Sequence, residues 1–496
     1  MLCVKLITFA VITALATGAG AAESVRGPSS SHTPYVTPTA GGWGVTSIIS
    51  VGDAADNRYR MVGIPDGLGA YDNGNSTFTV LMNHELAPLL GATRAHGATG
   101  AFVSEWVISK SDFRVLSGTD LARKHYLWNS ATNSYETATG TANSFNRLCS
   151  ADLPAASAFY NAARGIGTRE RLFMTGEEAG TEGRAYAFIA SGENKGNAYE
   201  LPKLGKFSWE NSLANPYSGD RTIIIGTDDS NPGQVYIYHG TKTNTGLEIE
   251  KAGLTNGSLA GVKVKANPAV TGNLESGPIN GTFSTIVVDT SVNGAAQQAN
   301  SRADGITEFA RPEDGAWADA KTFFFVTAGA DPDGDSAIGT QPSRLYKLTF
   351  NEDNGVADYN HGSISMVKDS STLVGTDGAT AQKFDNVAMG EDGKLYIQED
   401  PGNSPYIAKT WMFDPVASSW TQILESDRTR FAAPTAPFSQ DEESSGIIEI
   451  TSILGRHDGK RYFLANMQAH YNIPGELVQG GQLYLISVTP NQRPMP

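Results

Sequence analysis

Short runs of β-forming residues, each ending in polar and mostly acidic residues, recur six times along the chain. These runs occupy residues 77–82, 171–174, 221–225, 322–326, 394–398 and 461–465. After a turn, each is followed by a second β-rich run, at residues 102–108, 185–189, 235–238, 345–350, 407–413 and 483–488. Such pairs predict β-hairpins. Six hairpins, spaced by about 70 residues on average, predict an all-β fold, a six-bladed β-propeller with long loop insertions. A large β-sandwich or two β domains would share part of this pattern.

The pattern leaves little room for helices. The alanine-rich residues 151–163 predict one helix, in an insertion. No linker separates the hairpins into groups, so we expect a single domain over residues 23–496.

The first 22 residues predict a cleaved signal peptide. A short basic start is followed by an apolar run at residues 6–17 and by small residues before Glu23. No later stretch approaches the roughly 18 consecutive apolar residues of a membrane span. We therefore expect a periplasmic or extracellular protein with no membrane partner.

Net charge and cysteine content exclude several kinds of partner and any intrachain disulfide. The formal net charge is −15, and an acidic surface disfavours nucleic acid and anionic membranes as partners. An anionic substrate would also be repelled, unless bound cations reverse the local potential. Cys3 lies in the predicted signal peptide, so the mature chain keeps only Cys149 and forms no intrachain disulfide. We expect a monomer that is stabilised by a large core, by bound ions or by both.

The acids at the strand ends carry the main functional signal. We take the first run of each hairpin as the inner strand of a blade, so that residues beyond its end meet at the mouth of a central channel. Carboxylates gathered in this way cannot all stay ionised unless cations neutralise them. Oxygen ligands favour Ca²⁺ above all, with Mg²⁺, Mn²⁺ and Fe³⁺ as further candidates. Any one acidic pair is explained more simply as a solvated turn, but five coincident sites favour a metal centre. The candidate ligands at these ends are Glu85, Glu177, Glu178, Asp228, Asp229, Glu399 and Asp400.

Loops beside these strands add candidates. Arg311 lies two residues before Glu313, and an arginine beside acids can grip a phosphate oxygen while the acids hold a metal. Asp385 offers a further oxygen ligand before the fifth hairpin. Three alternating acids have the look of a calcium loop without the full EF-hand pattern, and are otherwise an acidic turn: Asp331, Asp333 and Asp335.

Five more residues have two interpretations each. Glu442 or Glu443 either adds a ligand before the sixth hairpin or belongs to a capped turn. His84 and His470 are either ligands or hydrogen-bonded supports. Cys149 is either a small buried residue or a thiolate ligand, which needs a nearby cation to lower its pKa.

Several segments together resemble the PhoX-type alkaline phosphatase family, which are metal-dependent six-bladed propellers that carry iron and calcium. The similar segments read Arg-Pro-Glu-Asp at 311–314, Phe-Asp-Asn-Val-Ala at 384–388, Ile-Gln-Glu-Asp at 397–400, Leu-Gly-Lys-Phe-Ser-Trp-Glu at 204–210 and Gly-Thr-Asp-Asp at 226–229. The resemblance implies that Glu210 is a metal ligand and that Glu177 and Glu178 match the family's paired glutamates. It also implies that Arg311 and Glu313 meet phosphate and metal as catalytic residues.

Two features depart from that family. Gly176 stands where the family has a cysteine that binds iron, and Cys149 is the candidate to replace it from a neighbouring loop. No twin-arginine pair precedes the apolar run, whereas many relatives are exported folded. Both features put the iron centre in question more than the calcium sites.

The sequence thus predicts a secreted phosphomonoesterase that acts on small phosphate esters with Ca²⁺, and with Fe³⁺ as a second candidate metal. No serine-hydrolase elbow and no phosphate-cradling P-loop occurs, which disfavours those two chemistries. Two alternatives stay open. One is a calcium-dependent propeller hydrolase of another class, a phosphodiesterase or a lactonase. The other is a non-catalytic secreted propeller with structural calcium.

Overall fold

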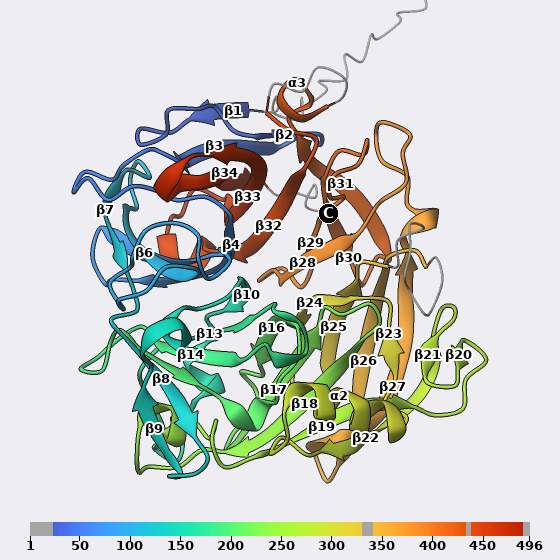
Figure 1. Ribbon diagram of the computed structural model, residues 1–496. Helices are drawn as coiled ribbons and strands as arrows, with labels where there is room; N and C mark the ends of the chain where they lie inside the picture. Colours follow the sequence, from blue (N-terminus) through green and yellow to red (C-terminus); the bar gives the residue numbers. More distant parts are fainter. Residues whose placement is uncertain (1–22, 330–340, 433–437, 490–496) are drawn as a thin grey trace, which may run out of the picture.

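The strands form six blades around one central axis (Figure 1). The computed structural model describes residues 23–329, 341–432 and 438–489. The first strand of each blade lies innermost, and each inner strand contacts the inner strand of the next blade, so that the ring closes. The fold is therefore a six-bladed β-propeller, as the hairpin pattern predicts. The inner strands are β4 (Pro65–Asp72), β10 (Leu148–Asp152), β16 (Trp209–Ala214), β24 (Pro312–Trp317), β28 (Phe384–Met389) and β32 (Glu442–Glu449).

Three further antiparallel strands follow outward in each blade. The second strands are β5 (Thr77–His84), β13 (Leu172–Glu177), β17 (Arg221–Asp228), β25 (Thr322–Thr327), β29 (Leu395–Glu399) and β33 (Arg461–Ile473). The third strands are β6 (Phe102–Ser109), β14 (Ala185–Ile189), β18 (Gly233–Thr241), β26 (Arg344–Asp353), β30 (Lys409–Asp414) and β34 (Val478–Val488). The fourth strands are β7 (Val115–Asp120), β15 (Asn197–Glu200), β19 (Ser258–Val264), β27 (Val356–Asp369), β31 (Ser419–Ser426) and β3 (Trp43–Ser50).

The beginning of the described chain closes the ring. In blade 6, β3 pairs antiparallel with β34, and β1 (Glu23–Arg26) pairs parallel with β3. The short β2 (Val36–Pro38) adds to β31 at the edge of blade 5. Blade 6 thus joins strands from both ends of the described chain. The division into a leader over residues 1–22, which lie outside the described residues, and one domain over 23–496 stays a prediction.

Insertions add strands at the periphery. β22 (Asn280–Val288) pairs with both β19 and β27 and joins blades 3 and 4 into one continuous sheet. The remaining strands are β8 (Lys124–Asn129), β9 (Ser134–Thr137), β11 (Tyr160–Asn161), β12 (Ile166–Gly167), β20 (Val270–Thr271), β21 (Leu274–Glu275) and β23 (Glu308–Phe309).

Helices are few and short in the described parts of the chain. They are α1 (Glu248–Lys251), α2 (Gly294–Ala303), α3 (Arg428–Phe431) and α4 (Thr451–Leu454), with 3₁₀ turns at Gly140–Asn143, Ala156–Ala158, Gly180–Glu182, Pro202–Leu204, Ser370–Thr372 and Gly475–Leu477. None of these helices has the length and hydrophobicity to cross a membrane.

The helix predicted at residues 151–163 is wrong. Ala151 belongs to β10, and the helical part of this segment is one 3₁₀ turn at Ala156–Ala158. Pro154 lies between them, and a proline disfavours helical backbone at the residue before it. The core contact of Ala151 between blades 1 and 2 outweighs its helix propensity.

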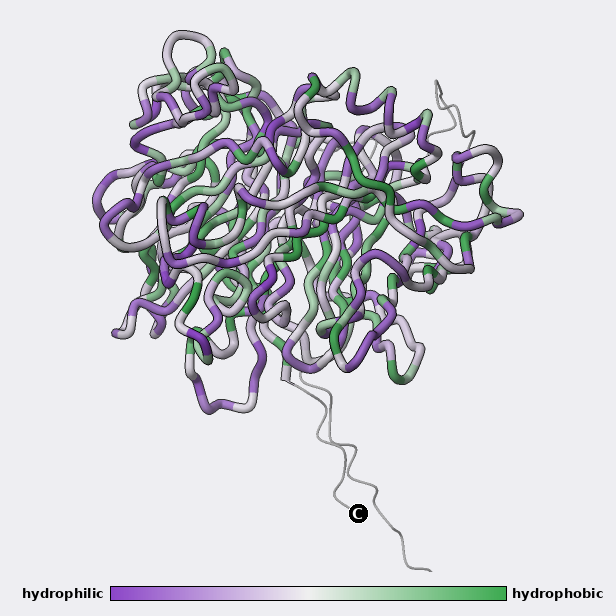
Figure 2. Tube along the Cα trace, turned by 90° about the horizontal axis from the view of Figure 1, so that it is seen from below, coloured by the Kyte–Doolittle hydropathy of each residue, from purple (hydrophilic) through white to green (hydrophobic). Residues whose placement is uncertain are grey.

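The hydrophobic core is divided among the six interfaces between neighbouring blades. Each interface holds its own cluster of buried side chains, and Figure 2 shows hydrophobic segments running through the interior of the molecule. Strand alternation explains the continuous apolar runs: Ile224 faces blade 2, while Ile223 and Ile225 face blade 4. Because blades are buried on both faces, their strands show no alternation of apolar and polar residues.

The prediction of which strands line the axis is wrong. The runs predicted as inner strands form β5, β13, β17, β25, β29 and β33, the second strand of each blade. The true inner strands precede them and run antiparallel to them. The end of a second strand therefore lies beside the start of an inner strand. This antiparallel pairing still brings the acids after the second strands to the axis, at the end where the inner strands begin.

Candidate metal centre at one mouth of the propeller

A ring of six side chains that can bind metals arises from one backbone position. The second residue of every inner strand is an acid or a cysteine, a set that we call the inner ring. In five blades this residue lies within a β-bulge, because three steps along the inner strand match two steps along its partner. Bulges re-aim side chains and recur beside active sites. The inner ring consists of Asp66, Cys149, Glu210, Glu313, Asp385 and Glu443.

A second ring comes from the end of the second strand in each blade. One residue of the second strand pairs with the first residue of the inner strand, and the next residue along the chain belongs to this ring. In every blade its backbone N–H donates to the carbonyl of the residue just before the inner strand, at 2.8–3.0 Å. This repeated bond fixes the second ring, which we call the outer ring, against the inner one. The outer ring consists of Glu85, Glu178, Asp229, Ala328, Asp400 and His470.

Ligand atoms from these rings form two groups. Asp66, Glu85 and Cys149 make one, and Glu210, Glu313 and Asp385 make the other. Within each group the ligand atoms lie within 4.8 Å of one another. All but the half-buried Asp385 are buried.

Some buried oxygens of these groups have no hydrogen-bond partner among the described residues. They include Oδ1 of Asp66 and Oε1 of Glu210. An unpaired buried acceptor carries a desolvation cost of about 1–3 kcal/mol, which a bound cation would remove. The donor sets therefore fit metal ions.

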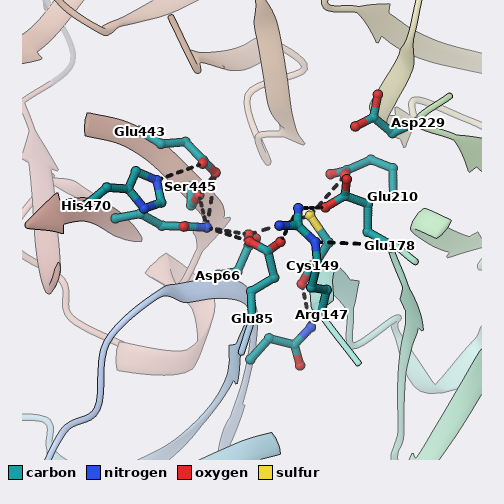
Figure 3. A network of polar contacts seen from close by, with 12 residues as sticks. Asp66, Glu85, Arg147, Cys149, Glu178, Glu210, Asp229, Glu443, Ser445 and His470 are labelled. Atoms are coloured by element: carbon teal, nitrogen blue, oxygen red, sulfur yellow. Dashed lines mark hydrogen bonds and ion pairs between the residues drawn. The ribbon is translucent and has the colours of Figure 1, made fainter. Parts of the chain in front are cut away.

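Polar contacts join the two groups (Figure 3). The Cys149 thiol donates to Oε2 of Glu210 at 3.1 Å and lies 3.7 Å from Oδ2 of Asp66. The Gln468 amide donates to Asp66 at 2.8 Å, to Glu85 at 3.1 Å and to Glu443 at 3.2 Å. Cys149 and Gln468 thus tie acids of different blades together.

Two arginines neutralise part of this negative charge. Arg311 forms a two-pronged ion pair with Asp229, with Nε and Nη2 each 2.8 Å from a carboxylate oxygen, and its Nη2 lies 3.2 Å from Glu313. Arg147 pairs with Glu178 and, at 2.6 Å, with Glu85. Both guanidiniums lie directly against acids of the two groups.

Burial and mutual repulsion dominate the electrostatics. Burial, followed by neighbouring carboxylates, raises the pKa of every inner-ring acid above its usual range. Burial also raises the pKa of the Cys149 thiol, with Asp66 and Glu210 adding to the effect. Burial favours protonated Asp229 too, but the Arg311 guanidinium, helped by Arg147, lowers the pKa of Asp229 below its ordinary value. The ring acids stay ionised together only if further positive charge is present.

The sequence-predicted pairs of acids divide between two roles. The second member of each pair, Glu178, Asp229 or Asp400, lies in the outer ring. The first member is instead held inside its own blade. Glu177 accepts the backbone N–H groups of Asn146 at 3.1 Å and Arg184 at 3.3 Å.

Asp228 and Glu399 follow the same rule. Asp228 accepts from the Ser208 N–H at 3.2 Å and the Ser230 hydroxyl at 2.7 Å. Glu399 accepts from the Trp411 indole at 2.7 Å and from two backbone N–H groups. Burial raises the pKa of Glu177, Asp228 and Glu399 to about 7 in each case.

The structure also places the remaining candidate residues. Glu443 belongs to the inner ring, whereas Glu442, in blade 6, accepts the N–H of Ala408 in blade 5 at 3.3 Å. His84 is fully buried, stacks on Phe102 and bonds the Gly63 carbonyl and Ser104. A predicted calcium loop, made of Asp331, Asp333 and Asp335, lies outside the described residues.

His470 lies at the edge of the centre. Its Nδ1 bonds Oε1 of Gln479 at 2.8 Å, and its Nε2 lies 3.8 Å from Glu443. Burial disfavours the charged imidazole, but the Glu443 carboxylate raises the pKa of His470 to about 10.

Position 176 could not supply a ligand in this backbone. A Cβ added at Gly176 would lie 2.3 Å from Cβ of Trp209, so no side chain fits there. Cys149 reaches the centre from the inner strand of the same blade.

Sequence reasoning missed three residues of the centre. Asp66 lies in Pro-Asp-Gly, which is typical of a turn and hides the start of a strand. Arg147 precedes Cys149 by two residues, the same spacing that separates Arg311 from Glu313. This repeated spacing could have indicated Arg147 as a residue of the centre. Gln468 is one of the polar residues that follow the run at 461–465, but its uncharged amide does not by itself indicate a metal site.

Comparisons with known proteins agree with this picture. The family model of the alkaline phosphatase PhoX matches residues 189–418. A solved structure of Pseudomonas fluorescens PhoX, in complex with vanadate as a transition state analogue, is similar with a TM-score of 0.62 and 12% sequence identity, covering 90% of this chain and 95% of that one. A Dyadobacter fermentans protein of unknown function aligns at 9% identity over 89% of this chain and 98% of that one, with a TM-score of only 0.36. No curated protein matches the chain. The predicted resemblance to the PhoX family and the predicted fold are confirmed.

Proposed function

We propose that this chain is a secreted, metal-dependent phosphomonoesterase whose catalytic centre is the mouth formed by the inner and outer rings. One observation carries the proposal: two groups of buried ligand atoms, drawn from different blades, lie against the guanidiniums of Arg311 and Arg147. A cation-lined site with adjacent arginines suits a phosphate group. The match to the PhoX family model, and the vanadate held by Pseudomonas PhoX, support this reaction class.

The donor atoms suit two kinds of metal. Glu210, Glu313 and Asp385 offer only oxygen, which Ca²⁺ prefers. Asp66, Glu85 and Cys149 add a thiolate to two carboxylates, a mixed set that suits a transition metal such as iron. When bound, such cations supply Lewis acidity and lower the pKa of a coordinated water.

The chain's own residues hold and orient the phosphate. Arg311 keeps its guanidinium plane fixed through the two-pronged contact with Asp229. Its remaining N–H donors can bind a phosphoryl oxygen and stabilise charge on the transferring group. Glu313 lies 3.2 Å from the same guanidinium and links it to the second metal group.

The direct test is turnover. Protein reconstituted with Ca²⁺ and iron is expected to hydrolyse p-nitrophenyl phosphate faster than bis-p-nitrophenyl phosphate or a lactone. Elemental analysis of the same sample identifies the metals. Absence of phosphatase turnover with both metals bound would refute the proposal, and preference for the diester or the lactone would favour the other hydrolase class.

Arg311→Ala tests the role assigned to that residue. Loss of one donor to transition-state charge is expected to lower kcat/KM about 10²–10³-fold. Arg164→Ala is the control and should keep full turnover: Arg164 forms an exposed pair with Asp220 and lies between the end of β10 and the start of β13, the strand ends opposite those that carry the rings. If Arg311→Ala keeps its melting temperature and full turnover, Arg311 is not catalytic.

A further inference from the structure

Arg147 and Arg311 occupy the same position in two different blades. Each immediately precedes the first residue of an inner strand and stands two residues before an inner-ring ligand, Cys149 or Glu313. Their φ angles are +44° and +57°, in the left-handed region. Lys383 has φ +42° at the same position in blade 5.

Left-handed backbone is uncommon for residues other than glycine and costs about 1 kcal/mol or more. Four residues nevertheless adopt it at one equivalent point, where the chain turns into the bulged start of an inner strand: Arg147, Arg311, Lys383 and, with φ +51° in blade 1, the uncharged Ile64. The conformation therefore belongs to the turn itself, and in blades 2, 4 and 5 this turn carries a basic residue. There the bend brings a long cationic side chain beside the ring acids.

The contacts of the two arginines are also equivalent. Arg147 binds Glu85, the outer-ring acid of the preceding blade, at 2.6 Å, and Arg311 binds Asp229, the outer-ring acid of its own preceding blade, at 2.8 Å. Glu85 belongs to one metal group, and Glu313, 3.2 Å from Arg311, belongs to the other. Each metal group therefore has its own arginine.

Both guanidiniums remain available to a ligand. The side chain of Arg147 is 47% exposed and that of Arg311 is 26% exposed. Among the described residues, Nη1 of neither arginine has a hydrogen-bond partner. The two side chains share one electrostatic environment, because both act on the Asp229 carboxylate. Arg147 lies against Glu85 of one metal group, and Arg311 lies against Glu313 of the other. A phosphate held between the groups would therefore face both arginines.

We propose that Arg147 is a second phosphate-binding residue, which grips the monoester from the side opposite Arg311 and makes the site selective for phosphomonoesters. This inference rests on the proposed function. A monoester dianion presents three terminal oxygens with two negative charges, enough for two guanidiniums and the metals. A diester has only two such oxygens and one charge, so it loses one of the two arginine contacts.

The test compares Arg147→Ala, Arg147→Lys and Arg184→Ala in metal-loaded protein. Arg184 is the matched control because it is an arginine of the same blade that pairs with the buried acids Glu177 at 3.5 Å and Glu200 at 3.6 Å. The first readout is the Kd for inorganic phosphate by calorimetry. The second is the ratio of monoester to diester kcat/KM. Metal content is measured for every variant.

We expect Arg147→Ala to raise the phosphate Kd at least tenfold and to lower the monoester-to-diester ratio by a similar factor. Arg147→Lys should recover part of both effects, because a lysine keeps the charge but loses the planar fork. Arg184→Ala should leave both unchanged. This pattern, at unaltered metal content, supports the inference.

Three results would count against specific claims. An unchanged phosphate Kd and ratio in Arg147→Ala, with an active wild type, overturns the role of Arg147 and leaves the proposed function standing. Metal loss in Arg147→Ala, with affinity falling in proportion, assigns Arg147 to the metal site and also overturns it. If wild-type protein binds phosphate, Arg147→Ala weakens that binding and neither shows turnover, the proposed function is refuted but the role of Arg147 in phosphate binding stands.

Discussion

The acids of the centre predict an unusual dependence of stability on pH. Oxygens of Glu210, Glu313 and Asp385 lie within 4.8 Å of one another. Two unit charges at that distance repel by about 3.5 kcal/mol at an effective dielectric constant of about 20, and three such pairs give about 10 kcal/mol. Typical proteins have only about 5–15 kcal/mol of total stability. Without cations, these groups must therefore hold protons.

The direction of the effect follows from proton binding. In the unfolded chain, carboxyl groups have a pKa of about 4. In the folded chain, burial and then neighbouring acids raise the pKa of Glu210, Glu313 and Asp385. Between the unfolded and folded pKa values the folded state binds more protons, so the free energy of unfolding of metal-free protein falls as pH rises. Ca²⁺ binds the deprotonated acids, so its stabilising effect grows over the same range.

The assay is thermal unfolding at pH 5, 6.5 and 8, in chelator and in excess Ca²⁺. We expect the melting temperature in chelator to fall between pH 5 and 8, and the Ca²⁺-induced increase to be largest at pH 8. A melting temperature in chelator that stays level or rises with pH would refute the reasoning, because the acids would then not be crowded.

One substitution isolates the cause. Asp385→Asn removes one carboxyl that must hold a proton at pH 8, which costs up to about 5 kcal/mol for a group with an unfolded pKa of about 4, so it should stabilise the metal-free protein at pH 8 by up to about that amount. It should also shrink the Ca²⁺-induced increase in melting temperature. Asp414→Asn, at the end of β30 and outside both metal groups, is the matched control and should reproduce the wild-type pH profile.

Neighbouring residues give three further predictions. Glu178→Gln should lower phosphatase kcat at least tenfold with little change in melting temperature, because Glu178 lies in the outer ring. Glu177→Gln should keep turnover but lower the free energy of unfolding in urea by about 1–3 kcal/mol, because Glu177 is held inside its blade by backbone N–H groups. Gly176→Cys should destabilise the protein by about 1–3 kcal/mol in urea unfolding, since its Cβ would lie 2.3 Å from Trp209. Elemental analysis should show no additional bound metal in this variant. Cys149→Ser should lower bound iron per chain more than bound calcium, measured by elemental analysis; equal loss of both would contradict separate metal groups.

The hairpin count could be predicted from sequence because second and third strands are buried on both faces. Runs such as Ile223–Ile225 are apolar throughout and stand out against polar turns. Inner strands give no such signal, since one edge meets the axis and carries polar residues. β4 begins Pro-Asp-Gly and β24 begins Pro-Glu-Asp-Gly, compositions that favour turns.

The acids that follow the second strands could be picked out along the chain, but the individual roles we assign to them depend on pairing register. Glu177 and Glu178 are adjacent and chemically identical. Glu177 pairs with Leu148 at the start of the inner strand and is held by backbone N–H groups, while Glu178 lies one residue beyond the pairing and reaches the centre. A shift of one residue would exchange these roles, and no composition-based argument fixes register to one residue.

The sixfold backbone and the unequal side chains separate what folding requires from what chemistry requires. The bond from each outer-ring N–H to the carbonyl before the inner strand repeats in all six blades, whatever side chain is present. The fold therefore does not demand Cys149 in blade 2 or Ala328 in blade 4. Ala328 leaves Arg311 without an acid from its own blade's outer ring, whereas Arg147 has both Glu178 and Glu85. Arg311 instead has the inner-ring Glu313 beside Asp229, so each arginine lies against two acids, which suits the pair to share one anionic substrate.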